Sequence, residues 1–407
     1  MHDAKILFFA MYIFLLFPKV RMSGIHETRY NFMVEWYDDM ASVTRRFYLL
    51  YFISNDTIEL IEAKNGRTFL KRIKCDGVTL KSIYIGSTLN IFSRQMKVID
   101  YGDGFTRETF SKITEKTYAM LKPESVPYLG KILEEIYSRG FKVTNAKMCL
   151  MSEENAKEFY KEHEGRTFFP TLVQHMSSAP VVGLELMGGN AIKAWRQEIG
   201  PTDVQQAKDE APTSLRAMYG INKTLNGFHG SDSPESAERE LEIFFPSKSS
   251  SRQSVPKSTA TFENSTCCVI LPHSIEEGNL GKIISEIQGA SFDITAMRMF
   301  YLDKTDVQEF YEVYEGVVAE HNGMVGQLIS GPCVALEVKH PSCKNQEEIV
   351  NKFRLLVGPS DPEIARELRP ISLRAKYGVT KVKNAIHCTD LPEDGSLEVE
   401  YFFKILE

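Results

Sequence analysis

Residues 214–233, SLRAMYGINKTLNGFHGSDS, return at residues 372–391 as SLRAKYGVTKVKNAIHCTDL. The histidines of these two stretches, His229 and His387, lie 158 residues apart and occupy the same place in each. Solenoid proteins repeat every 20–50 residues or so, far below this spacing. The chain is therefore predicted to carry two tandem copies of one domain.

Shorter matches extend the repeat toward the N-terminus of each copy. EFYKEHEG (158–165) returns as EFYEVYEG (309–316), and SSAPVVGLEL (177–186) returns as ISGPCVALEV (329–338). The distance between matched positions is 151 residues at the first of these matches and 158 residues at the histidines. The second copy has therefore gained seven residues, which we place in the stretch 339–353.

Strand-like and helix-like stretches alternate within the first copy. Runs rich in β-branched and apolar residues indicate strands, and amphipathic stretches with capping residues indicate helices. Strands and helices in βαββαβ order predict an α+β fold with a ferredoxin-like sheet. The predicted strands are 116–123, 142–151 and 180–188, and the predicted helices are 126–140, 152–165, 190–200 and 236–246, the last running into a final strand.

The chain before the first copy has a different pattern. Short runs rich in aromatic and β-branched residues occur at 46–54, 57–63, 68–73 and 88–101. Turn signals such as Asn-Gly and Asp-Gly separate them. Such runs are typical of a small antiparallel β module, which we place over residues 30–112.

A Ser- and Lys-rich stretch separates the two copies. Residues 248–260 show no periodic apolar face and are predicted to be a linker. The first copy is then expected over residues 115–247 and the second over residues 261–407. With the β module this gives three domains, as expected for 407 residues at about 150 residues per domain.

Residues 1–29 form an N-terminal extension with a conflicting signal. It contains the apolar run ILFFAMYIFLLF (6–17), which is too short to cross a bilayer comfortably. No stable membrane insertion is therefore predicted. One interpretation is an upstream extension with the working start at Met22 or Met33, and the other is a signal anchor.

The overall composition excludes several classes of protein. With 43% hydrophobic and 25% charged residues, the chain is globular rather than disordered or fibrous. A formal net charge of −6 provides no basic footprint for nucleic acid, so no nucleic-acid partner is predicted. Seven scattered cysteines without a CxxC pair indicate a reducing compartment and neither a disulfide framework nor a zinc site.

His229 is the strongest candidate for chemistry because it recurs together with two arginines. Arg196 and Arg216 return as Arg354 and Arg374. An imidazole has an ordinary pKa of about 6.5 and therefore accepts a phosphoryl group well near neutral pH. Arginine guanidinium groups neutralise the negative charge of that phosphoryl group. These residues predict phosphoryl transfer. Each residue taken alone also has a structural interpretation, as a solvated loop histidine or a surface charge.

The motifs resemble those of one enzyme family. The loop NGFHGSDS (226–233), the dipeptide Lys122-Pro123 and the segment SLRAMYG (214–220) are similar to the nucleoside diphosphate kinase family, and the likeness covers both copies. The order of a β module and two kinase copies resembles the subgroup of nucleoside diphosphate kinase 7 homologues. In that subgroup the N-terminal module is a DM-ten type domain with a pleckstrin-homology-like β fold.

The resemblance implies roles for the matching residues of the first copy. His229 would take the terminal phosphate of ATP or another nucleoside triphosphate and pass it to a nucleoside diphosphate in ping-pong order. Glu240 would fix the tautomer of its ring, with Tyr160 and Ser231 beside it. Mg²⁺ would bridge the phosphates largely through water and phosphate oxygens. The residues implied in nucleotide binding are Lys122, Phe168, Leu172, Arg196, Thr202, Arg216 and Asn226.

Two departures from the family pattern stand out. Residues 124–126 are Glu-Ser-Val, where the family usually has Asp-Gly-Val. In the second copy, the positions of the phosphate-binding lysine and of two base-contacting residues fall on Leu271, Ala319 and Gly323. Loss of a charged donor to phosphate costs about 1.5–3 kcal/mol of binding, so this degenerate copy is predicted to be weak or inactive. The matching residues that persist in it are His387, Arg354, Arg374, Asn384, Tyr311 and Glu398.

Two classes of function are compatible with this resemblance. One is a nucleoside diphosphate kinase whose activity resides in the first copy. The other is a mainly structural role, because the subgroup resembles proteins of axonemal doublet microtubules, centrosomes and the γ-tubulin complex. The expected partners are therefore nucleoside di- and triphosphates together with tubulin or axonemal proteins. The expected locations are the cytoplasm, the cytoskeleton, the cilium axoneme and the centrosome.

Overall fold

The computed structural model describes residues 28–38, 40–246 and 255–407. The apolar run 6–17 and most of the predicted linker lie outside the described residues. The chain divides into two compact units: one reaches to Gly86 and includes Lys97–Glu108, and the other comprises Ser87–Met96 and Thr109–Glu407. Among the described residues, no helix has the length and apolar character needed to cross a membrane.

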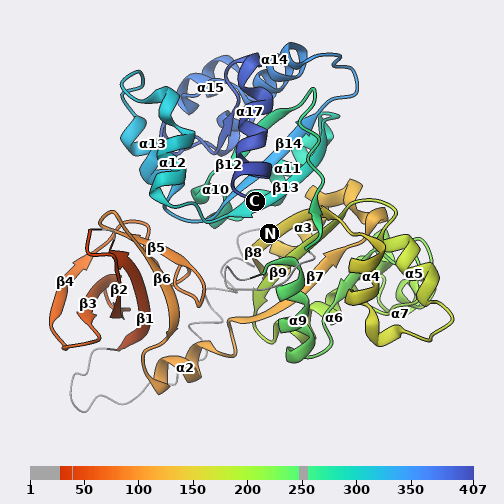
Figure 1. Ribbon diagram of the computed structural model, residues 1–407, viewed down its shortest axis with the longest axis horizontal. Coiled ribbons are helices and arrows are strands. Elements are labelled where there is room, and N and C mark those ends of the chain that lie inside the picture. Colours follow the sequence, from red (N-terminus) through yellow and green to blue (C-terminus); the bar gives the residue numbers. More distant parts are fainter. Residues whose placement is uncertain (1–27, 39, 247–254) are drawn as a thin grey trace. The chain divides into compact units, whose positions relative to one another are not determined.

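The N-terminal module contains a curved six-stranded antiparallel sheet in the order β4-β3-β2-β1-β6-β5 (Figure 1). Alternating side chains of its strands are buried, which confirms the predicted β module. The predicted strand 88–101 is instead a hairpin, because Phe92 and Ser93 have positive φ angles of 48° and 64°. Its elements are β1 (Arg29–Asp38), β2 (Val43–Phe52), β3 (Thr57–Glu62), β4 (Thr68–Lys74), β5 (Thr88–Ile91) and β6 (Arg94–Tyr101), followed by α2 (Gly104–Phe110).

The first copy forms an antiparallel sheet in the order β10-β7-β9-β8. Numbered within the copy this is 4-1-3-2, which confirms the predicted ferredoxin-like fold. Its strands are β7 (Glu115–Leu121), β8 (Lys142–Leu150), β9 (Val181–Gly188) and β10 (Phe228–Gly230). Its helices are α3 (Leu129–Ser138), α4 (Glu153–Phe159), α5 (Phe169–Met176), α6 (Ala191–Ile199), α7 (Val204–Glu210), α8 (Leu215–Tyr219) and α9 (Pro234–Phe244).

The predicted final strand of this copy was placed wrongly. The helix α9 ends at Phe244 without running into a strand, and the fourth strand is β10, inside the histidine loop. Three residues are too few for an alternating pattern to be recognised in sequence. The predicted helix 126–140 also begins later, since Pro123–Tyr128 form a 3₁₀ turn before α3.

The second copy repeats this arrangement in the order β13-β14-β12-β15. Its strands are β12 (Thr266–Ile270), β13 (Asp293–Phe300), β14 (Cys333–Lys339) and β15 (Ile386–Cys388). Its helices are α10 (Pro272–Glu276), α11 (Leu280–Gly289), α12 (Lys304–Phe310), α13 (His321–Leu328), α14 (Gln346–Val357), α15 (Pro362–Leu368), α16 (Leu373–Tyr377) and α17 (Gly395–Glu400). A 3₁₀ turn (Pro392–Asp394) precedes α17, and a π-helical turn (Tyr401–Ile405) follows it.

The two copies form one nine-stranded sheet, because β8 and β13 pair at Lys147 and Arg298. The end of the predicted linker is not irregular: residues 257–258 form β11 and pair with β8. Helices α3 and α11 pack closely at Gly130 and Gly281. A Cβ at Gly130 would lie 2.3 Å from the Ser285 backbone nitrogen, so larger residues are excluded there.

Candidate active site

Strand β10 exposes His229 on one face while its neighbours enter the core. Phe228 is fully buried, and the His229 side chain is 17% exposed. The Trp195 indole N–H donates to the His229 carbonyl at 3.1 Å. A Cβ on Gly230 would lie 2.5 Å from the Trp195 ring, so this strand requires glycine beside the histidine. The histidine backbone is therefore fixed by β7 on one side and by α6 on the other.

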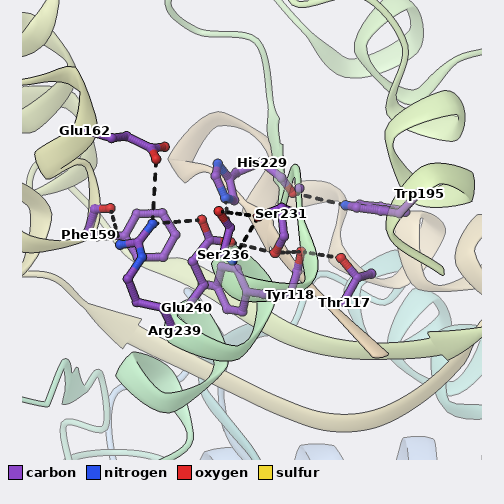
Figure 2. A network of polar contacts seen from close by, with 12 residues as sticks. Thr117, Tyr118, Phe159, Glu162, Trp195, His229, Ser231, Ser236, Arg239 and Glu240 are labelled. Carbon is purple, nitrogen blue, oxygen red and sulfur yellow. Dashed lines mark hydrogen bonds and ion pairs between the residues drawn. The ribbon is translucent and has the colours of Figure 1, made fainter. Parts of the chain in front are cut away.

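A buried carboxylate holds the imidazole ring. Glu240 on α9 is 2% exposed, and its Oε2 lies 3.0 Å from His229 Nε2. The Ser231 hydroxyl donates to the same oxygen at 2.6 Å, as Figure 2 shows. A carboxylate accepts at this contact, so Nε2 carries the proton, and in the neutral ring Nδ1 is the nitrogen with the lone pair. Arg239 lies 3.6 Å from the other Glu240 oxygen.

Aromatic rings surround the histidine. The ring centres of Phe159, Tyr160 and Tyr118 lie 5.0, 5.8 and 6.0 Å from that of His229. The Tyr160 hydroxyl is buried without a hydrogen-bond partner in the described part of the chain, and burial raises its pKa far above the usual value. An unpartnered buried hydroxyl is costly, so it favours a polar ligand beside the imidazole.

Cationic side chains cluster near the histidine. Lys122 is 6% exposed and donates to Asn226 Oδ1 at 2.8 Å. Burial, reinforced by the charge of Arg216, lowers the pKa of Lys122 to about 8. Burial, reinforced by the charge of Arg196, lowers the pKa of Arg216 to about 10. Cations that lower one another's pKa are stabilised by a bound anion, so the cluster is suited to phosphate.

Backbone carbonyls orient the arginines and the asparagine. Arg216 donates to the Gly200 and Phe228 carbonyls at 2.6 and 3.0 Å. Arg196 makes a longer contact, 3.5 Å, with the Gly230 carbonyl. The Asn226 amide donates to the Thr202 carbonyl at 3.2 Å. Through Asn226, the Thr202 backbone is thus joined to Lys122 and so to the cationic cluster that contains the two arginines.

The two predicted base-contacting residues lie near the start of α5 and differ in exposure. Phe168 is 51% exposed, whereas Leu172 is 8% exposed and packs in the core. Phe168 meets the edge of His163, which stacks on Tyr160. A continuous row of rings therefore leads from the exposed Phe168 to the histidine, while Leu172 mainly supports the helix.

The second histidine site lines a cavity of about 680 Å³. His387 Nε2 lies 3.1 Å from Glu398 Oε2, and Thr389 donates to the same oxygen at 2.8 Å. Arg354 forms a short ion pair with Asp390, which also accepts from Tyr314 at 2.7 Å. This copy retains the histidine–glutamate pair, but one of its arginines is already neutralised.

The other matching residues of the second copy lie around the same cavity. Arg374 donates to the Ile386 and Gly358 carbonyls at 3.1 and 2.9 Å, as Arg216 donates to their counterparts. Asn384 donates to the Ser360 carbonyl at 3.3 Å. The buried Tyr311 ring lies edge-on to His387, with its centre 5.8 Å away.

The positions predicted to match Phe168 and Leu172 in the second copy were wrong by one residue. Helix α13 begins one residue later relative to Tyr311 than α5 does relative to Tyr160. The position of Phe168 therefore falls on Glu320 rather than Ala319, and that of Leu172 on Met324 rather than Gly323. The insertion was assigned entirely to residues 339–353, but one of its residues precedes α13. The aromatic base contact is still absent from this position.

Two models of known protein families match this chain. The model of the nucleoside diphosphate kinase family matches residues 115–250 and 264–407. The chain belongs to this family. A model described as the nucleoside diphosphate kinase 7 N-terminal PH domain matches residues 24–112.

Similar proteins of this family match nearly the whole chain or one kinase copy. Nucleoside diphosphate kinase homolog 7 of Rattus norvegicus is 48% identical over 379 residues, covering 93% of this chain and 94% of that protein. The Mus musculus protein of the same name is 46% identical over equal coverage. The solved nucleoside diphosphate kinase of Aquifex aeolicus is 45% identical and covers 31% of this chain and 92% of its own, with a TM-score of 0.31.

Sequence reasoning missed several residues of this kinase-family site. Trp195 and Arg239 gave no repeat signal, because their positions in the second copy are occupied by Phe353 and Leu397. Glu124 was noted only as a departure from the family pattern, and its partner His175 was not noted at all. Chain spacing gave no signal for His175, since 51 residues separate it from Glu124.

The site is rich in cations and amides rather than metal ligands. Within residues 28–38, 40–246 and 255–407, no group of three or more His, Cys, Asp or Glu side chains is placed to hold a metal ion. Lys122, Arg216 and Asn226 suit phosphate oxygens instead.

Proposed function

We propose that the first copy transfers the terminal phosphate of a nucleoside triphosphate to a nucleoside diphosphate through phosphorylated His229. The observation that carries this proposal is the His229–Glu240 contact, which makes Nδ1 the nucleophilic nitrogen of the neutral ring, near the buried cations Lys122 and Arg216. Family membership supports the same reaction class.

The reaction has two balanced halves. The Nδ1 lone pair of His229 attacks the terminal phosphorus, and the bond to the bridging oxygen breaks, so its electron pair leaves with the nucleoside diphosphate. The acceptor diphosphate then attacks the same phosphorus through a terminal oxygen, and the N–P electron pair returns to Nδ1. Glu240 keeps the proton on Nε2 and stabilises the positive charge that phosphorylation creates on the ring.

The surrounding residues bind and orient the nucleotide. Lys122, Arg196 and Arg216 neutralise the phosphates, and Asn226 and Thr202 bind the phosphates and ribose. Phe168 stacks on the base, and ring stacking discriminates little between bases, so several nucleotides would be accepted. Mg²⁺ enters with the nucleotide as part of the substrate and neutralises phosphate charge.

Labelling with ATP that carries a radioactive terminal phosphate tests this proposal. The whole chain is expected to acquire acid-labile, base-stable label, and the His229→Ala variant is expected to lose it. His387→Ala is the matched control, because its ring has the same carboxylate contact in the second copy. Label that survives His229→Ala, or is lost only in His387→Ala, would overturn the assignment.

A second candidate function is a structural role on microtubules, at the cilium axoneme, the centrosome or a γ-tubulin complex of the cytoplasm. Strand β4, an outer strand of the N-terminal sheet, exposes Lys71 and Lys74 beside the half-exposed Phe69 and Ile73, and Arg67, directly before the strand, is also exposed. A basic strand of this kind complements the acidic surface of tubulin.

Charge reversal tests the structural role separately from catalysis. Lys71→Glu with Lys74→Glu is expected to reduce co-sedimentation with microtubules while leaving label on His229 intact. The matched control, His229→Ala, is expected to sediment normally. Unchanged sedimentation of the charge-reversed protein would exclude β4 as the contact surface.

A further inference from the structure

Glu124, which departs from the usual family residue, bridges two parts of the nucleotide site. Its Oε1 accepts from the Gly227 backbone N–H at 2.7 Å, and its Oε2 lies 2.9 Å from His175 Nε2. Both side chains are largely buried, at 7% and 11% exposure. A carboxylate only accepts at these contacts, so His175 donates from Nε2.

The first contact fixes the loop that leads into the catalytic histidine. Gly227 has a φ of +80°, and its carbonyl accepts from the Lys122 backbone N–H at 2.9 Å. Its peptide is therefore held at both ends, by Glu124 and by Lys122. Asn226, immediately before it, receives the hydrogen bond from the Lys122 ammonium group, and His229 follows two residues later.

The second contact fixes the helix that carries the base-contacting side chains. His175 lies near the end of α5, the helix that contains Leu172 and begins directly after Phe168. Glu124 thus connects this helix to the loop of Asn226. Burial alone raises the pKa of Glu124, but hydrogen bonds from His175 and backbone N–H groups outweigh it and hold the pKa below its usual value.

The second copy lacks this bridge. Gly227 corresponds to Ala385, whose carbonyl keeps the contact with Leu271, but the positions of Glu124 and His175 are occupied by His273 and Gln327. His273 Nδ1 is buried without a partner in the described chain, and burial lowers the pKa of His273 to about 4. Gln327 bonds to Ser330 within its own helix end instead.

We propose that Glu124 and His175 are a positioning pair, which sets nucleotide affinity by joining helix α5 to the loop Asn226–His229 without touching the reacting atoms. This inference rests on the proposed function of the first copy. The negative charge of Glu124 also acts on Lys122 and helps keep that ammonium group protonated. Loss of the pair loosens both sides of the nucleotide site while the His229–Glu240 contact stays intact.

The test separates binding from chemistry in the whole chain. Glu124→Gln and His175→Gln are each expected to raise the KM for ADP, and its Kd by titration calorimetry, by about fivefold or more, with kcat changed less than about twofold. Glu124→Asp keeps the charge on a shorter side chain and is expected to fall between wild type and Glu124→Gln. Gln327→Ala removes the side chain at the matching helix position of the second copy and is expected to change neither constant.

The outcomes distinguish this inference from the proposed function. If wild type carries label on His229 but both glutamine variants bind ADP as wild type does, the positioning pair is wrong and the reaction stands. If kcat falls while the ADP Kd is unchanged, the pair acts on chemistry and the inference is equally wrong. If Glu124→Gln strongly lowers the Tm, its weaker binding could reflect unfolding. The test then rests on His175→Gln, because His175 is the less buried of the two residues. Absence of label in wild type contradicts the proposed function, whereas the Kd values still test the pair.

Discussion

In the first copy Arg196 acts on Asp232 through its charge and lies beside Arg216, whereas in the second copy the equivalent Arg354 forms a direct ion pair with Asp390. The cause lies in the residues around the aspartate. Ser236 bonds Asp232 in the first copy and is the main reason why the pKa of Asp232 is lowered. Asp394 replaces this serine in the second copy.

The two copies show that the fold does not depend on the excess positive charge beside His229. Both copies keep a histidine on the fourth strand, a carboxylate on the next helix and an arginine bound to backbone carbonyls. These contacts are satisfied within the protein and stabilise the sheet without a ligand. The buried lysine is costly without an anion. The second copy has lost this lysine, and it pairs Arg354 with Asp390.

The largest expected effect comes from removing the negative charge of the glutamate that contacts the histidine, a contact found in each copy. Glu240→Gln is expected to slow labelling of His229 by about a hundredfold, because the imidazole loses the group that fixes its tautomer and stabilises its charge. Glu398→Gln, the matched change in the second copy, is expected to leave labelling unchanged. Rapid-quench measurement of the label checks both, and a similar loss in Glu398→Gln would show that the second copy carries the phosphate.

The next test replaces Lys122 with leucine, the residue found at the equivalent position of the second copy. Lys122→Leu removes a buried charged donor, so the Kd for ADP is expected to rise by roughly tenfold or more. Titration calorimetry measures this directly, and thermal unfolding should show no loss of stability, since burial of the lysine is itself unfavourable. An unchanged Kd would mean that the lysine does not contact phosphate, and the asymmetry between the copies would lose its main support.

The same lysine predicts a pH dependence that the second copy should lack. The pKa of Lys122 is about 8 in the unbound protein, so the side chain is charged below that pH and neutral above it. Affinity for ADP is therefore expected to fall as pH rises through 8, by at most about tenfold per pH unit. The fall should disappear in Lys122→Leu. A flat profile in wild type would contradict the role of the lysine charge.

The repeated residues predicted two copies of one domain, and the family resemblance implied the His229–Glu240 pair, but neither revealed the contacts that distinguish the copies. Repetition in register identified His229 and His387, and the alternating elements predicted a ferredoxin-like sheet, although its last strand was placed wrongly. Strand β10 was missed because three residues show no pattern, and Glu320 was missed because one inserted residue shifted α13. The Glu124–His175 bridge depends on folding two distant segments together, which spacing along one sequence does not reveal.

The smallest expected effect comes from restoring charge to the second copy. Asp390→Asn removes the partner of Arg354, and the freed guanidinium is expected to strengthen ADP binding at His387 by about threefold. The gain is modest because the pair is partly exposed and Leu271 still replaces the lysine. Calorimetry in a Lys122→Leu background reduces binding at the first site, so the change at His387 can be followed, with Asp232→Asn as the matched change in the first copy. If ADP binds no better, Arg354 is not what limits the second copy, and the missing lysine and aromatic ring account for its weakness.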